Sequence, residues 1–211
     1  MTNRSRRVLL GAFAALPGIS VLADLVPAAA AAPQKSAAEQ FIRQSGERLV
    51  NIVNGPGSAS QKADKLRALV DEIVAVNQIG RFVLGRFWNV ATPEQRQQYM
   101  TLFHQLLAFN ITTQIRAYVG ITFHVLGAQN GPEGEMVSTV INRPDHPPAN
   151  VQWVVQDIKG TPKIIDVVVE GTSLRITERS DYASVISDNG GQVTALLEAM
   201  KNQLKRMEAN E

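Results

Sequence analysis

The stretch IGRFVLGRFWNVATPEQRQQY, residues 79–99, joins an apolar cluster to a strong helix start. Five of the seven residues from Phe82 to Trp88 are bulky and apolar, and at helical spacing they point to several sides. The run TPEQ at residues 92–95 offers a Thr cap, a Pro at the first helical position and a Gln that closes a capping box. The stretch therefore predicts a short helix and then a long one. The short helix is either buried or faces something apolar besides its own core.

Helical periodicity continues on both sides of this stretch. Apolar residues at helical spacing predict helices over residues 36–53, 60–73, 77–88 and 92–119, and again over 173–187 and 192–207. The first begins with Ser36 three residues before Glu39, and Ser60 is the expected cap of the second. The long helix carries a wide apolar face.

Four strands are expected between the two groups of helices. They are ITFHVLGA (121–128), EMVSTVIN (135–142), NVQWVVQDI (150–158) and KIIDVVVEG (163–171), separated by turn-forming residues. Short turns between consecutive strands favour an antiparallel meander. The predicted fold class is α+β: a four-stranded curved antiparallel sheet wrapped by N-terminal and C-terminal helices around an apolar cavity. The fourth strand is apolar on both sides, which a central place in the sheet would explain.

The beginning of the chain has the features of an export signal. Arg4, Arg6 and Arg7 precede the uncharged run 8–23, and small residues follow it. We expect residues 1–31 to be a cleaved signal and residues 32–211 to be one domain. An uncleaved anchor is the alternative, although the run is shorter than the roughly 20 residues of a spanning helix. The paired arginines resemble a twin-arginine signal.

Charge and cysteine content exclude several functions. The chain has 21 basic and 19 acidic residues, and without the signal, which contains Arg4, Arg6, Arg7 and Asp24, each total is 18. A nucleic-acid partner is not expected, because no Lys/Arg block remains. Cysteine is absent, so neither a disulfide framework nor a thiolate metal site is possible.

No pattern indicates catalysis. His104, His124 and His146 lack the spacing of metal ligands or of a base with its partners. Asp166 lies in an apolar strand and needs a partner, for which Arg86, Arg175 and Arg179 are candidates. We expect no enzyme activity, no catalytic residue, no metal and no cofactor. A cavity enzyme using Asp166 or His124 remains an alternative, as does an interaction module whose apolar faces are all used in its core.

Two stretches resemble one protein family. LGRFWNVATPEQRQQYMTLFHQLL (84–107) and IIDVVVEGTSLRITERSDYASVI (164–186) resemble motifs of the toluene-tolerance (Ttg2-like) proteins, which include the periplasmic lipid carrier of the Mla system. The resemblance implies a periplasmic carrier that holds phospholipid acyl chains in an apolar cavity. It implies exchange of lipid with an inner-membrane ABC-transporter complex and an outer-membrane lipoprotein complex. A hopanoid or other polycyclic lipid is the alternative cargo.

On this hypothesis the segment 82–88 packs on the domain with one side and lines the cavity with another. The resemblance places Phe87, Trp88, Phe103 and Leu107 at the cavity, and Asp166, Glu170 and Arg179 at scaffold positions. The full set of expected lipid-binding residues is Phe82, Phe87, Trp88, Phe103, Leu106, Leu107, Ile111, Ile115, Trp153, Val167, Val169 and Tyr182.

Overall fold

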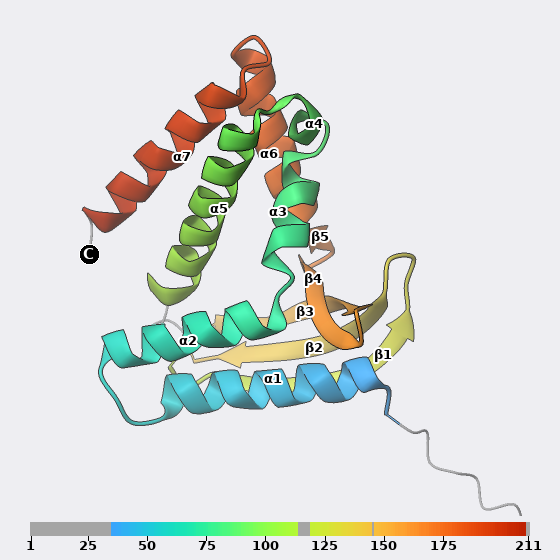
Figure 1. Cartoon of the computed structure of the whole chain (residues 1–211). Coiled ribbons are helices and arrows are strands. Elements are labelled where there is room, and N and C mark those ends of the chain that lie inside the picture. Colours follow the sequence, from blue (N-terminus) through green and yellow to red (C-terminus); the bar gives the residue numbers. More distant parts are fainter. Residues whose placement is uncertain (1–34, 114–118, 145, 210–211) are drawn as a thin grey trace, which may run out of the picture. The chain divides into compact units, whose positions relative to one another are not determined.

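The first group of helices begins at the caps that the sequence offers. The computed structural model describes residues 35–113, 119–144 and 146–209 (Figure 1). The expected signal, residues 1–31, lies outside this part. Helix α1 (Ala37–Asn54) is capped by Ser36, whose hydroxyl accepts from the backbone N–H of Glu39 at 3.0 Å. Helix α2 (Ala59–Ile73) begins two residues earlier than expected, because Ser58 and Gln61 form a complete capping box.

The stretch 79–99 forms parts of three helices. Helix α3 (Val76–Leu84) ends at Gly85, whose φ of 56° is a left-handed conformation that favours glycine. A four-residue helix α4 (Phe87–Val90) follows, and then the long helix α5 (Pro93–Thr113). The expected capping box of α5 forms, with Thr92 and Gln95 exchanging hydrogen bonds of 3.0 and 3.2 Å. The apolar residues 82–88 point to several sides because the chain turns at Gly85.

The strands form an antiparallel meander in the order β1-β2-β3-β4-β5. Their bounds are β1 (Thr122–Asn130), β2 (Glu135–Arg143), β3 (His146–Ile158), β4 (Thr161–Val169) and β5 (Thr172–Ser173). The expected antiparallel sheet is thus confirmed, and a two-residue fifth strand extends it. Strand β3 begins earlier than expected, at His146, and two of its residues, Pro147 and Pro148, stand opposite the single residue Asn142. A bulge tolerates proline because it leaves ladder positions unpaired.

Bulges change which side chains share a face. In β4 the register shifts between Ile164 and Asp166, which leaves Ile165 as the extra residue. Strict alternation assigns Ile164 to the face opposite Val167, but in the structure both belong to one apolar cluster. In β1 the extra residue is Leu126, next to Gly127 at φ 153°.

Strand β4 does not lie at the centre of the sheet. Among the strands that the structure describes, only the two-residue β5 lies beyond it, paired with Val168 and Val169. The segment between α2 and α3 follows β4 further along, where Val74 forms a parallel bridge with Ile164 and the Ala75 N–H donates to the Ile164 carbonyl at 2.9 Å. Strand β4 is thus apolar on both of its faces without being a central strand; it lies next to the end of the sheet.

Two helices complete the described part. They are α6 (Leu174–Asp188), capped by Ser173, and α7 (Val193–Glu208). Figure 1 shows α1 and α2 beside the sheet, and α3, α5, α6 and α7 grouped together. Among the described residues, no helix is both long and apolar enough to cross a membrane.

The apolar core has two parts. The helical cluster joins α3, α4, α5, α6 and α7 around Tyr99, Leu84 and Leu197. The sheet cluster joins α1 and α2 to β2, β3 and β4 around Ile42, Leu66 and Val137. A cavity lies where these two clusters meet.

Candidate functional site

A cavity of about 730 Å³ separates part of the helical cluster from the sheet cluster. Its lining comes from α1, α2, α3, α5 and α6, and from the four long strands. This volume is within the roughly 300–1,000 Å³ typical of sites that bury a small ligand. The walls are mainly aliphatic and aromatic, so the cavity suits an apolar ligand.

Most of the expected site residues do line this cavity. The lining includes Phe103, Leu106, Leu107, Ile111, Trp153, Val167, Val169 and Tyr182. Ile115 lies outside the described residues. The long helix α5 supplies four of these side chains because its apolar face is wide enough to contact both clusters. The Trp153 Nε1–H donates a hydrogen bond to the Thr139 hydroxyl at 2.9 Å, which fixes the ring. The ring centroids of Trp153 and Phe123 are 6.4 Å apart.

The wall formed by α1 and α2 was not expected from sequence. It consists of Ile42, Ser45, Gly46 and Leu49 of α1 and Leu66, Leu69, Val70 and Ile73 of α2, followed by Val74. These residues form the apolar faces of two amphipathic helices, and periodicity does not distinguish a face that meets a cavity from one that meets a packed core. Gly46 has a specific role, because a Cβ there would come within 2.5 Å of the Phe123 ring.

The structure places Phe82, Phe87 and Trp88, which we expected to bind lipid, outside the lining of this cavity. Of the segment 82–88, only Val83 is part of the lining. Phe87 is 8% exposed within the helical cluster, with the Arg86 guanidinium 4.8 Å from its ring centroid. Phe82 has the guanidinium carbons of Arg175 and Arg179 at 4.3 and 4.8 Å from its ring centroid.

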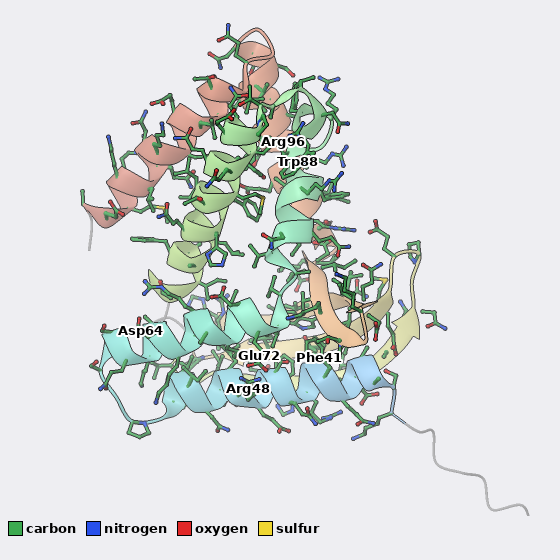
Figure 2. The ribbon with its side chains drawn as sticks, in the orientation of Figure 1. Phe41, Arg48, Asp64, Glu72, Trp88 and Arg96 are labelled. Atoms are coloured by element: carbon green, nitrogen blue, oxygen red, sulfur yellow. The ribbon has the colours of Figure 1, made fainter. Side chains whose placement is uncertain are left out.

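Trp88 instead makes cation–π contacts with two arginines. The guanidinium carbons of Arg81 and Arg96 each lie 5.6 Å from its ring centroid, and the Arg96 Nε–H donates to the Trp88 carbonyl at 2.7 Å. Figure 2 shows Trp88 and Arg96 together at the beginning of α5, away from the sheet. The apolar side chains of residues 82–88 are thus covered by arginine guanidinium groups and by the helical cluster. A bound ligand is not needed to explain why this segment is so apolar.

The buried pair of Asp166 and Arg175 forms one polar part of the wall. Asp166 accepts hydrogen bonds from the Ser173 hydroxyl at 2.6 Å and from the Val167 N–H at 2.8 Å. Its Oδ2 lies 3.2 Å from Nε of Arg175, without hydrogen-bond alignment, and Arg175 also pairs with Glu133. Of the three candidate partners, Arg175 is therefore the one that pairs with Asp166. Burial lowers the pKa of Arg175 from its ordinary 12.5.

Two tyrosines pack against each other between α5 and α6. Tyr99 and Tyr182 pack edge to face with ring centroids 6.2 Å apart, and the Tyr99 hydroxyl donates to the Gly80 carbonyl at 2.9 Å. Burial, and next the negative charge of Glu178, raise the pKa of both phenols far above the ordinary 10.0. Both phenols therefore stay neutral at physiological pH and act as packing groups with a hydrogen-bonding end.

Metal chemistry has no support in the described part of the chain, where no cluster of three or more His, Cys, Asp or Glu side chains forms. His104 pairs with Asp71 at 2.9 Å on the surface. His124 and His146 are exposed.

An apolar cavity between a meander sheet and a helical cluster defines a binding protein for an apolar ligand. The sequence model of the MlaC protein family matches residues 43–202, and the chain belongs to this family. The expected family is thereby confirmed. The fold is also that of a phospholipid-binding protein from Ralstonia solanacearum, solved in complex with a phospholipid. The TM-score is 0.70 at 22% identity, over 82% of this chain and 99% of that one.

Proposed function

We propose that this protein is a periplasmic lipid carrier that holds the acyl chains of a phospholipid in the cavity between its two clusters. The observation that carries the proposal is the cavity itself, about 730 Å³ with mainly apolar walls. Membership of the MlaC family and the phospholipid found in the Ralstonia solanacearum protein support this choice of cargo.

The energetics suit reversible carriage. Each methylene removed from water contributes about 0.8 kcal/mol, so a lipid in this cavity is stable in aqueous surroundings. A bilayer offers the same methylenes a similar environment. Transfer between membrane and cavity is therefore close to balanced, as a carrier requires.

Family membership suggests the route. We propose that the protein exchanges lipid with an inner-membrane ABC-transporter complex and an outer-membrane lipoprotein complex, and that residues 1–31 direct its export. The proposed role is binding and transport without catalysis. Asp166, one of the two residues considered for a cavity enzyme, pairs with Arg175.

Native mass spectrometry tests the proposal directly. The full-length sequence is expressed in a Gram-negative bacterium, and the exported protein is purified from the envelope fraction without detergent. We expect a bound mass that fragments as a diacyl phospholipid and that disappears after organic extraction. A bound mass that fragments as a polycyclic lipid would identify that lipid, and not a phospholipid, as the cargo. A bare protein under gentle conditions would contradict the carrier function.

A further inference from the structure

Two arginines line the cavity, and their surroundings differ. Arg175 is buried, with a side chain 7% exposed, and it pairs with Asp166 and Glu133. Arg143 is half-buried at the end of β2. Among the described residues, no carboxylate pairs with Arg143. The first guanidinium is neutralised by the protein, whereas the described part of the chain leaves the second without an anion.

Arg143 lies at an end of the cavity that reaches solvent. It is two residues from Ile141 on β2, and both side chains line the cavity. Ile141 pairs in register with Phe123 of β1, and Phe123 belongs to the same cluster as Ile111 near the end of α5. Asn110, next to Ile111, is an exposed member of the lining. The end of α5 and the end of β2 therefore form one partly open, partly polar end.

A filled cavity favours an anion at this position. A guanidinium keeps its charge at any physiological pH, so Arg143 cannot become neutral when acyl chains displace the water around it. An unpaired cation against hydrocarbon is costly, and the long side chain can only turn toward the open end to limit that cost. A phosphate group supplies the negative charge and accepts two parallel N–H hydrogen bonds from the guanidinium.

We propose that Arg143 binds the phosphate of the cargo lipid, so that the headgroup lies at the end of β2 and α5 and the acyl chains extend between the two clusters. This inference rests on the proposed carrier function and adds a headgroup preference to it. The cavity selects lipids that carry a phosphate, and Arg143 is the residue that determines this selectivity.

The experiment compares the full-length protein with Arg143→Gln and with Arg206→Gln, which removes the same charge from an exposed site on α7. Each exported protein is stripped of lipid and offered equal amounts of phosphatidylglycerol and of diacylglycerol with the same chains. Native mass spectrometry then gives the ratio of the two complexes. For a half-exposed ion pair, we expect Arg143→Gln to lower the phosphatidylglycerol preference about 2- to 5-fold. The Arg206→Gln protein should match the unsubstituted protein in both the lipid ratio and the lipid load.

The remaining outcomes separate the two proposals. If the unsubstituted protein holds both lipids equally, or if Arg143→Gln keeps the original ratio, the carrier function stands and the role of Arg143 is wrong. If neither lipid binds, both proposals fail. Inorganic phosphate is a third probe, because an Arg143-dependent complex with free phosphate that leaves the lipid ratio unchanged would assign the site to a soluble anion.

Discussion

The substitution Leu107→Arg tests whether α5 faces the cargo. Leu107 is half-buried and lines the cavity beside Leu106, which is 3% exposed. In the lipid-free protein an arginine at 107 would extend into a hydrated cavity, so the fold should form. Acyl chains would then have to displace the water around its charge.

The size of the effect follows from that displacement. An uncompensated buried charge costs about 3–5 kcal/mol, and the partial exposure of Leu107 lets the arginine reach toward water, which favours the lower value. A loss of about 3 kcal/mol weakens lipid binding about 150-fold. The variant should therefore fold and carry almost no lipid.

Native mass spectrometry measures the lipid load of the variant, and circular dichroism with thermal melting confirms its fold. Gln105→Arg is the control, because Gln105 is exposed on the same helix and outside the lining. We expect this control to carry a normal load. A folded Leu107→Arg protein with a full lipid load would refute the proposed orientation of α5.

Three further outcomes are expected from the packing. Trp88→Leu removes two cation–π contacts of about 0.5–1 kcal/mol each, so urea denaturation should show a loss of about 1–2 kcal/mol while the lipid load stays unchanged; a loss of lipid would return Trp88 to the cavity wall. The raised pKa values of Tyr99 and Tyr182 mean that only the unfolded state ionises them above about pH 10. The two neutral phenols contribute fully to stability below that pH, and above it the free energy of unfolding should fall by about 1.4 kcal/mol per pH unit for each tyrosine. Tyr182→Phe should remove the part of this pH dependence that Tyr182 causes. An unchanged pH dependence in that variant would contradict the raised pKa of Tyr182. Gly46→Ala forces the Phe123 ring to move from a 2.5 Å contact, which should cost about 1–3 kcal/mol and reduce the lipid load, whereas unchanged stability and load would contradict the close packing of α1 on β1.

Capping residues in the sequence correctly predicted the helix starts that depend only on hydrogen bonds within the first turn. The Ser36 cap and the Thr92–Gln95 box form as expected, because a side chain three residues from a free N–H needs no tertiary contact. The start of α2 was misplaced because Ser58 and Ser60 both suit a cap, and only the box with Gln61 decides between them.

Tertiary features account for the remaining differences. A single helical period over residues 77–88 could not show that the chain turns at Gly85 and that Phe87 then packs in the helical cluster. The bulge at Ile165 is another such feature, since one unpaired residue reverses the alternation before it. Within the site, the unusually wide apolar face of α5 indicates from sequence that this helix lines a cavity. The apolar faces of α1 and α2 have the pattern of ordinary core helices, and only the structure shows that they line the cavity too.

The two ends of the sheet have a consequence for behaviour at high concentration. A long, straight edge strand is a template for another chain, and aggregation often begins there. On one side β5 is only two residues long, and the bridge between Val74 and Ile164 occupies part of the remaining edge. On the other side the bulge at Leu126 and the left-handed Gly127 interrupt β1. In the part of the sheet that the structure describes, neither edge offers an uninterrupted ladder of free N–H and C=O groups, so we expect this protein to resist strand-to-strand polymerisation even when crowded.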